Sequence, residues 1–516
     1  MRKPILATLV AMTSLLAAAH VLDTSLYPAR IEGDRWGYIA AESGFKAIND
    51  IYDEARPFYD GRAAVSVLGS WGFIDRNGSL AVPLRYKQVT DFYDGRAFVV
   101  APDGPVEIID TTGTRVGSLG SGTMLVTPQS HVIRTALNGS TSLLTYDGTV
   151  ITDGLDRNGR YLITGELDGG RLSFKDRYTQ LTGLMDLTGT ITVPARYDVI
   201  LLCDHATDLA VAQMSTPEGL MAGLVDAQGH ELLPIEFFDI DDLGHGLFGC
   251  ERENGKGTHI YDARAHRWLY RDNNLKIINP SDSPSLLPAY DGTAWGYVDS
   301  EGRWMIEPSY VMASGFNGGR AAVALDEADT PGDYHSILIT EEGLAAGGRP
   351  RFCRYIQPID ERSAITEITD DAFSAEEVAD AILSHITPER VVVIPWDATV
   401  EMIAKRDNIS YDTFATKYVF VMGLSVGNYV NIDLIVDGRF TDGAGRVVRD
   451  ARCSSITVVA QLYDHAEENH AALARALLSR LGIDSDGGSE RREVTIAGRR
   501  CVYEKVGTDL TFTFEL

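Results

Sequence analysis

The stretch that decides the fold runs from residue 71 to residue 99 and reads WGFIDRNGSLAVPLRYKQVTDFYDGRAFV. Residues 71–74 and 80–82 are rich in aromatic and branched side chains that alternate along the chain, which predicts two strands. Between them, we expect Asp75 to open a type I turn and Gly78 to take the left-handed position of a bulged hairpin loop. A third strand is predicted at residues 96–99, after the turn that Gly95 ends.

This stretch is one copy of an internal repeat. With Asp75 as the origin, glycine stands at positions −3 and +3, proline at +8, an aromatic residue at +11, phenylalanine at +17 and glycine at +20. Most of these offsets recur around Asp186, Asp226 and Asp299. Matches at four separate places indicate a true repeat. The residues that define it are Trp36, Gly37, Trp71, Gly72, Asp75, Gly78, Pro83, Tyr86, Phe92, Gly95, Asp186, Gly189, Pro194, Tyr197, Asp226, Gly229, Pro234, Trp295, Gly296, Asp299, Gly302, Tyr310, Phe316 and Gly319.

The period predicts nine copies over roughly residues 36–345. Their origins lie at positions 40, 75, 110, 147, 186, 226, 262, 299 and 340, with gaps of 35–41 residues. The Trp-Gly pair is missing at 110, 147 and 262, and the copies at 147, 262 and 340 are supported mainly by the even spacing. Because one such unit cannot bury a core alone, neighbouring units must stack.

The residue types suggest how a unit packs. A proline at +8 has no N–H to donate, so it marks an edge strand or the end of a strand. Small residues in the third strand let neighbouring sheets approach closely. We expect the tryptophan to pack against the aromatic residue of the next copy, with the adjacent glycine leaving room for it. The aromatic residues are expected in the core, although an array of them could also line a sugar or peptide groove.

The pattern Trp-Gly-Tyr-Ile, Asx-x-Gly, Pro-x-x-Tyr and Phe-x-x-Gly-x-Ala resembles the WG repeat, also called KWG, which occurs in tandem mostly in bacterial proteins. The resemblance covers about 60% of the chain and is specific at the copies with origins 40, 75 and 299. It implies a β-rich repeat with no general catalytic activity, so it assigns no catalytic residue and no cofactor.

The predicted fold class is therefore mainly β: a tandem WG-repeat array followed by a smaller α+β domain. Three or four short strands in each unit suit either a closed, β-propeller-like ring or an open β-superhelix. We favour the propeller-like ring.

The first residues differ from the rest of the chain. A short basic start precedes an uncharged, mostly apolar stretch, and Ala17 and Ala19 form an A-x-A-like cleavage site. Residues 1–19 are predicted to be a signal peptide, which would place the mature protein outside the cytoplasm, in the cell envelope or secreted. The alternative is an uncleaved signal anchor, which would hold the protein in a membrane.

A composition break at residues 346–350 follows the array and is typical of a linker. Residues 351–516 then predict an α+β domain of no recognised family. Ser374 to Glu377 form a capping box that predicts a helix start, and residues 464–481 predict a second amphipathic helix ending at Gly482. Strands are predicted at 390–395, over two runs within 416–436, and at 493–497, 499–504 and 509–515.

The charge balance excludes one class of partner. Lys and Arg number 46 and Asp and Glu number 73, which gives a net charge of −27. A protein this acidic is repelled by phosphate backbones, so we expect no nucleic-acid partner. The 50 glycines fit many tight turns.

Few residues suggest chemistry. The five scattered cysteines form no metal motif, and we expect buried free thiols, with a Cys453–Cys501 bridge as the alternative. His465 and His470 stand five apart, which puts them on different sides of a helix and predicts exposed surface, not a zinc site. Residues 484–490 begin like a calcium loop but are too short for one.

Two further groups are explained more simply by structure than by chemistry. The turn aspartates could in principle form a cation-binding ring, but turn geometry accounts for each of them. His205, His245 and His335 are expected in loops without partners. We therefore predict no metal and no cofactor.

These observations favour a non-enzymatic, exported scaffold that binds a protein or peptide. One alternative is a carbohydrate- or wall-binding module that uses the repeat aromatics. Another is an enzyme with its site in residues 351–516.

Overall fold

The repeat residues form nine small antiparallel sheets in a computed structural model of the chain. The structure describes residues 22–102, 104–120, 122–126, 131–157, 159–167, 170–177, 179–203, 209–272, 274–278, 280–327, 334–359, 366–369, 374–391, 394–399, 409–412, 417–426, 430–437, 452–462, 467–483, 491–506 and 509–516. The predicted signal peptide, with Ala17 and Ala19, lies outside them. Within the described residues, no helix is long and apolar enough to cross a membrane.

The first five sheets follow the order of the chain, with three strands added from elsewhere. In sheet order, the first is β36 (Tyr355–Ile356), β2 (Leu26–Arg30), β3 (Trp36–Ala40) and β4 (Lys46–Tyr52), and the second is β1 (Leu22–Asp23), β5 (Glu54–Tyr59), β6 (Arg62–Val67), β7 (Ser70–Ile74) and β8 (Leu80–Tyr86). The third is β9 (Gln88–Val89), β10 (Arg96–Val100), β11 (Val106–Asp110) and β12 (Arg115–Gly120). The fourth is β37 (Thr366–Thr369), β13 (Thr123–Val126), β14 (His131–Thr135), β15 (Thr141–Thr145) and β16 (Val150–Thr152), and the fifth is β17 (Tyr161–Leu167), β18 (Arg171–Asp176), β19 (Thr182–Asp186) and β20 (Ile191–Tyr197).

The next three sheets have four strands in chain order, and the ninth has three among the described residues. The sixth is β21 (Val199–Leu202), β22 (Leu209–Thr216), β23 (Gly219–Asp226) and β24 (Glu231–Phe237), and the seventh is β25 (Asp239–Gly244), β26 (Leu247–Glu251), β27 (His259–Asp262) and β28 (Arg267–Tyr270). The eighth is β29 (Lys276–Ile277), β30 (Leu287–Tyr290), β31 (Trp295–Val298) and β32 (Trp304–Tyr310), and the ninth is β33 (Met312–Ala313), β34 (Arg320–Glu327) and β35 (Tyr334–Thr340).

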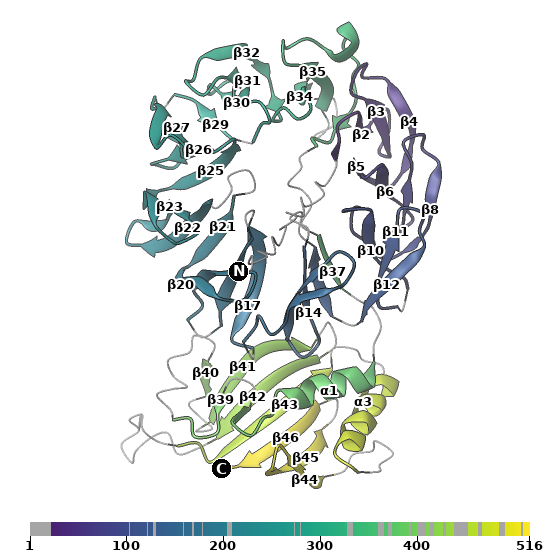
Figure 1. Ribbon diagram of the computed structural model, residues 1–516, viewed down its shortest axis with the longest axis vertical. Coiled ribbons are helices and arrows are strands. Elements are labelled where there is room, and N and C mark those ends of the chain that lie inside the picture. Colours follow the sequence, from purple (N-terminus) through teal and green to yellow (C-terminus); the bar gives the residue numbers. More distant parts are fainter. Residues whose placement is uncertain are drawn as a thin grey trace, which may run out of the picture.

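The sheets stand around a ring, with the first strands toward the centre and the last strands on the rim (Figure 1). This confirms the mainly β, propeller-like prediction and shows that the array closes. Separate apolar clusters fill the spaces between successive sheets, for example one that joins Val82 and Tyr86 of the second sheet to Val99 and Ile109 of the third. The core is therefore built by stacking.

The ring closes through the segment that follows the repeats. Cys353 exchanges two backbone hydrogen bonds with Ser336 of the ninth sheet, at 2.8 and 2.9 Å. Three residues later, Ile356 pairs with Ala29 of the first sheet. Ala346 is buried in the same cluster as Tyr27 of the first sheet. Residues 346–356 therefore form a structural joint, here called the closing segment. The sequence predicted a linker at 346–350 and placed 351–356 in the α+β domain.

The joint repeats contacts found elsewhere in the ring. The guanidinium of Arg62 donates to the carbonyl of Thr111 in the next sheet's hairpin turn, at 2.9 Å. Arg320 of the ninth sheet donates in the same way to the carbonyl of Ala41 in the first turn, also at 2.9 Å. The first and ninth sheets thus meet as ordinary neighbours.

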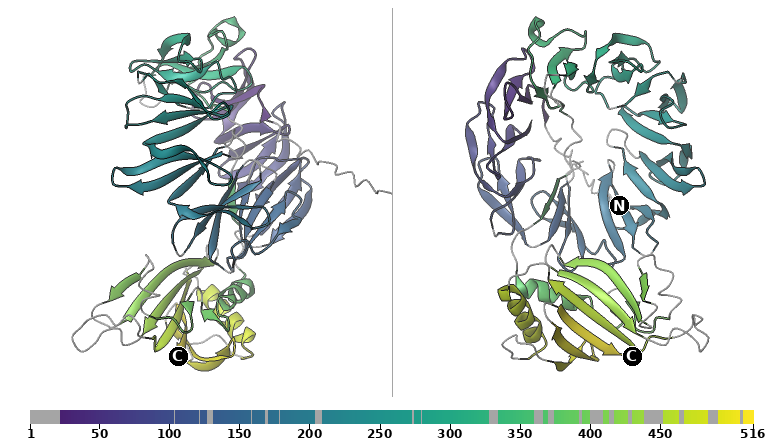
Figure 2. Two further views of the ribbon diagram at one scale, coloured as in Figure 1. Left: turned by 60° about the vertical axis from the view of Figure 1, so that its left-hand side comes forward. Right: turned by 180° about the vertical axis from the view of Figure 1, so that it is seen from behind.

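The second body is an α+β domain. Its seven-stranded antiparallel sheet has the order β40 (Ile409–Asp412), β41 (Lys417–Val426), β42 (Val430–Asp437), β43 (Ser455–Leu462), β46 (Asp509–Glu515), β45 (Arg499–Val506) and β44 (Arg492–Ile496). Helices α1 (Ala375–Ser384) and α3 (Glu467–Arg480) pack on one face of it (Figure 2). The predicted strand at 390–395 is a small hairpin of β38 (Arg390–Val391) and β39 (Ile394–Pro395).

The fourth sheet of the ring carries this domain. Strand β37 pairs with β13, so residues 366–369 belong to the ring although they follow the predicted linker. Leu137, in the β14–β15 turn, is buried in the core of the α+β domain. The structural change from ring to second domain therefore lies after residue 369.

Candidate functional site

The hairpin turns of the repeat follow one geometry. One carboxylate oxygen of Asp75 accepts hydrogen bonds from the backbone N–H groups of Asn77 and Ser79, both at 2.9 Å. Gly78 has a φ of 79° and donates its N–H to the carbonyl of Asp75. The same carboxylate contacts occur at Asp110, Asp186, Asp226 and Asp299. The turn aspartates are thus occupied by their own turns.

One predicted origin is shifted. In the fourth sheet the equivalent hydrogen bonds join Thr145 to Thr149 and Gly148 to Thr145. The turn therefore begins at Thr145, and the predicted origin at Asp147 was two residues late. Asp147 instead accepts from the N–H of Thr149 at 3.0 Å.

The glycine beside the tryptophan has a different role from the predicted one. A Cβ on Gly72 would lie 2.5 Å from the carbonyl oxygen of Val82 in the outer strand β8. The same close approach of the outer strand occurs at Gly37, Gly183, Gly223 and Gly296. This glycine therefore makes room for a bulged neighbouring backbone, not for the tryptophan.

The tryptophan rings are half-buried and already have partners. The guanidinium of Arg56 lies 4.5 Å from the centre of the Trp71 ring. Trp36 meets Arg30 at 4.9 Å and Tyr355 at 5.8 Å, and Trp295 packs on Tyr290 at 5.3 Å. These partners differ from the predicted aromatic residue of the next copy, and they cover ring surface that a sugar would need. The aromatic residues Tyr86, Phe92, Tyr197, Tyr310 and Phe316 are buried.

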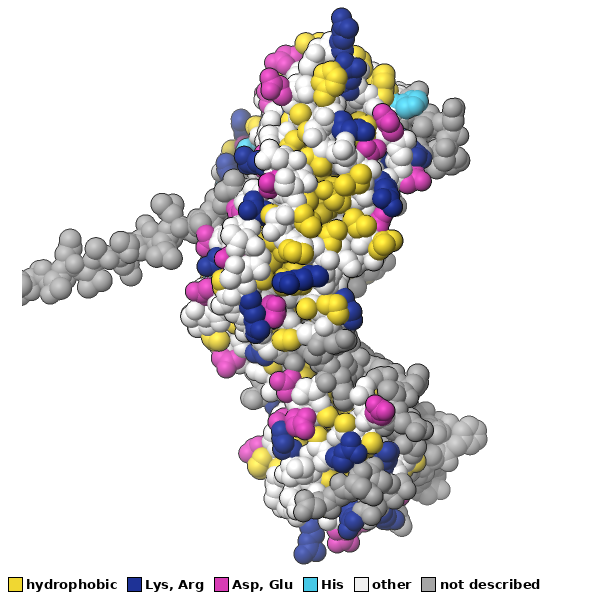
Figure 3. Space-filling model, turned by 90° about the vertical axis from the view of Figure 1, so that its right-hand side faces the viewer, with side chains coloured by type: hydrophobic (Ala, Val, Ile, Leu, Met, Phe, Trp, Pro, Cys, Tyr) yellow, Lys and Arg dark blue, Asp and Glu magenta, His cyan; other side chains and the backbone are white. Residues whose placement is uncertain are grey.

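The outer strands form the rim of the ring and carry prolines Pro83, Pro194, Pro234 and Pro308. Each lies in the middle of an edge strand. Of the two predicted positions for this proline, the edge strand is therefore correct and the strand end is not. Hydrophobic side chains gather on the side of the rim that holds β4, β8 and β12 (Figure 3). Ile51, Leu80 and Val116 are exposed there.

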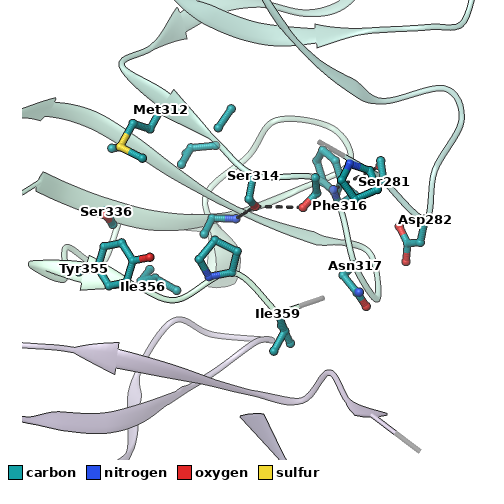
Figure 4. A pocket seen from close by; sticks show the side chains of 17 residues that line it. Ser281, Asp282, Met312, Ser314, Phe316, Asn317, Ser336, Tyr355, Ile356 and Ile359 are labelled. Atoms are coloured by element: carbon teal, nitrogen blue, oxygen red, sulfur yellow. Dashed lines mark hydrogen bonds between the residues drawn. The ribbon is translucent and has the colours of Figure 1, made fainter. Parts of the chain in front are cut away.

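A cavity of about 290 Å³ lies at the joint between the ninth and first sheets. Its walls come from β33, β34, β35, the loop at residues 280–282 and residues 355–359 (Figure 4). Most of the lining is apolar, including Met312, Phe316, Val323, Ile356 and Ile359. This seam cavity exists because the chain returns across the ninth sheet to close the ring.

Backbone contacts hold the wall of the seam cavity in place. The Ser314 hydroxyl donates to the carbonyl of Gly315 at 3.0 Å and accepts from the N–H of Ala322 at 2.9 Å. The buried Ser281 hydroxyl accepts from the N–H of Phe316 at 3.2 Å. A Cβ on Gly315 would lie 1.7 Å from the carbonyl oxygen of Pro280, so only glycine fits there. Both hydroxyls are thus engaged in hydrogen bonds to the backbone of the cavity wall.

One carboxylate stands at the mouth of the seam cavity. Asp282 is exposed, and its carboxylate accepts from the N–H of Gly318 at 2.6 Å. Partial burial raises the pKa of this carboxyl above its usual value. The imidazole Nε2 of His245 lies 2.8 Å from the backbone carbonyl of Asp282, so His245 has a partner, contrary to the prediction.

The other predicted residues form no second site among the described residues. His470 is buried, which corrects the predicted exposed position, while His465 lies outside the described part. His335 is in β35 and contacts the Phe352 ring, not a loop. All five cysteines are buried and free, and burial raises the pKa of Cys353 and Cys453 to about 11. His205 and residues 484–490 also lie outside.

No group of three His, Cys, Asp or Glu side chains in the described part of the chain is placed to hold a metal ion. The seam cavity was not predicted from the sequence. Four of its lining residues, Tyr355, Ile356, Pro358 and Ile359, lie beyond the composition break, in the part of the chain that the sequence assigned to the second domain.

The solved structures similar to this chain are distant. The crystal structure of the eukaryotic initiation factor is 12% identical with a TM-score of 0.44, over 65% of this chain and 98% of that one. BamB from Moraxella catarrhalis is 13% identical with a TM-score of 0.28, over 55% and 97%. The C-terminal WD40 domain of Sif2 is 11% identical with a TM-score of 0.28, over 61% and 91%.

No curated protein matches the sequence. The model of one family does match: the WG containing repeat, at residues 51–69, 71–100 and 295–327. The first two matches run from the end of β4 in the first sheet to β10 in the third, and the last spans the eighth and ninth sheets. Together with the nine related sheets, these matches confirm the resemblance seen in the sequence: the chain is a WG-repeat-containing protein.

Proposed function

We propose that the protein is a non-enzymatic scaffold that binds a protein or peptide partner outside the cytoplasm. The seam cavity carries this proposal, because it is apolar, has a fixed wall and opens on the surface of a closed ring. A volume of about 290 Å³ is at the small end for ligand pockets and suits one large side chain. Anchors of this kind dominate the affinity of many protein interfaces.

The tryptophan environment favours this function over sugar binding. Sugar-binding sites need an aromatic face free for stacking, but Arg56 covers a face of Trp71 and Arg30 and Tyr355 contact Trp36. In the seam cavity, by contrast, the apolar side chains of Met312 and Ile356 face an unfilled volume.

Selection of random displayed peptides on the full-length protein tests the proposal. We expect enrichment of sequences with one large apolar residue. Ala324 lines the cavity and is 3% exposed, so Ala324→Leu fills part of it. This variant should weaken the selected peptides at least about tenfold, since burial of a leucine-sized group stabilises by about 1.5–3 kcal/mol.

The controls separate lost binding from lost folding. Ala47→Leu makes the same change at an exposed position of β4 and should leave affinity unchanged. Met312, 45% exposed, gives a second variant, Met312→Ser, which keeps the fold and removes apolar contact. Selected peptides that bind both cavity variants as tightly as the parent protein would rule out the seam cavity as the anchor.

A further inference from the structure

The mouth of the seam cavity holds a negative charge in a fixed place. The backbone N–H of Asp282 donates to the carbonyl of Phe316 at 2.9 Å, and its carboxylate accepts from Gly318 at 2.6 Å. The carboxylate is therefore tied to the same turn that forms the cavity wall. Asp282 and the apolar wall line one continuous space.

Among the described residues, His245 is the one basic group whose charge lowers the pKa of this carboxylate. No lysine or arginine there forms an ion pair with Asp282. The guanidinium of Arg320 is engaged by the carbonyls of Ala41 and Gly319, at 2.9 and 2.8 Å. The Tyr27 hydroxyl donates to the carbonyl of Asn317. His245, the remaining basic neighbour, is bonded to a backbone carbonyl.

An unneutralised carboxylate beside an apolar cavity attracts a particular ligand. Burial removes part of the hydration of Asp282, and the nearby His245 does not fully offset this loss, since the pKa of the carboxyl stays raised. A cationic group bound beside the carboxylate would therefore stabilise its charged form. The overall charge of −27 adds long-range attraction for cations. An anionic group at the same place would be repelled.

We propose that the seam cavity selects a peptide in which a large apolar side chain is followed by a basic residue, with Asp282 as the partner of the basic group. This inference rests on the proposed function and names its ligand class. The apolar side chain supplies most of the affinity. Asp282 supplies the preference for a basic residue next to that side chain in the peptide.

Three blocked tetrapeptides test the inference on the full-length protein: acetyl-Ala-Phe-Lys-Ala-amide and the same peptide with Gln or Glu in place of Lys. Affinities are measured by titration calorimetry or saturation-transfer NMR. We expect the Lys peptide to bind about fivefold more tightly than the Gln peptide, the upper range for a partly exposed ion pair. The Glu peptide should bind more weakly than either.

Two variants assign the preference to one residue. Asp282→Asn removes the charge and keeps an oxygen that accepts from Gly318, so it should equalise the Lys and Gln peptides. Asp272→Asn makes the same change at an exposed position away from the cavity and should keep the preference.

The outcomes separate this inference from the proposed function. If Lys and Gln peptides bind the parent protein equally, and Ala324→Leu weakens both, the role of Asp282 is overturned and the apolar anchor stands. If none of the three peptides binds, or Ala324→Leu leaves their binding unchanged, the apolar anchor itself is overturned. A Lys preference that survives Asp282→Asn also overturns the assignment.

Discussion

The second and seventh sheets share the order of their four repeat strands but follow the repeat pattern to different degrees. The second contains Trp71 and Gly72, and its outer strand β8 is seven residues long. The seventh has Thr258 and His259 at these positions, and its outer strand β28 has four residues. In both sheets the turn before the outer strand nevertheless has an aspartate, Asp75 or Asp262, that accepts from backbone N–H groups.

The same division holds around the ring. The five copies with a glycine at the −3 position have outer strands of seven residues, β4, β8, β20, β24 and β32. Of the four copies without it, three have outer strands of six, three and four residues, β12, β16 and β28, and the copy at 340 has no outer strand among the described residues. The −3 glycine therefore belongs to the long, bulged outer strand, whereas a turn held by an aspartate also occurs in copies without that glycine, at Asp110 and Asp262.

The largest effect that would test this comparison is expected from Gly72→Ala. The new Cβ would meet the backbone of Val82 and Pro83, which has no side-chain freedom to move away, so we expect a loss of about 3 kcal/mol. Urea unfolding followed by tryptophan fluorescence measures it. Gly117→Ala in the third sheet is the matched control, because its Cβ would meet only the flexible end of Ile108. Equal losses would refute the role of the outer strand.

A second prediction uses charge in the inner strand of the seventh sheet. Burial, with Asp239 and Glu251 nearby, raises the pKa of Asp241 to about 6 from its ordinary 3.8. The folded state thus binds this proton more tightly than the unfolded state, so the group costs nothing below pH 3.8 and lowers stability as pH rises through 6.

We therefore expect Asp241→Asn to stabilise the protein by about 2 kcal/mol at pH 7.5 and to have little effect near pH 4. Melting temperatures of parent and variant at the two pH values measure the difference. A stabilisation that is the same at both values would show that charge is not the cause. Asp272→Asn, at an exposed site of the same region, serves as the control.

The smallest loss of stability is expected at the feature that the two sheets share, the aspartate of the hairpin turn. Asp75→Ala removes the acceptor of two exposed backbone N–H groups and should cost about 1 kcal/mol. Asp262→Ala should cost about the same, because it also serves two N–H groups at 3.0 Å. Urea midpoints of the two variants decide this. If Asp262→Ala left stability unchanged, the two turns would share their shape but not the stabilising contribution of the aspartate.

The comparison also explains how far the sequence could predict the structure. The contacts of Asp75 and Gly78 lie within a turn of a few residues, so the local sequence pattern was sufficient to predict that turn. The role of Gly72 could not be predicted in this way. A side chain at Gly72 would clash with backbone atoms of a bulge in β8, and the spacing of the repeat does not show where that bulge lies.

Ring closure and the seam cavity depend on contacts that no local pattern describes. Ile356 pairs with Ala29, more than 300 residues away, and the glycines at 347 and 348 resembled those of a linker. Gly347 instead lies against the first hairpin turn: a Cβ at this position would lie 2.9 Å from the carbonyl oxygen of Ser43. No sequence motif surrounds Asp282. Its place at the cavity could not be predicted, because it depends on a hydrogen bond to Phe316, which is distant in the sequence.

The position of the closing segment sets an order of events during synthesis. The hairpins of the first sheet are local and form early, but its strand β2 waits for β36, which follows the last repeat. Contacts this distant in sequence form slowly. Until they do, β2 presents an unpaired edge of the kind that recruits other chains. The first sheet is thus begun first but completed only after the last repeat has been made, and in that interval the nascent chain is exposed to misassembly.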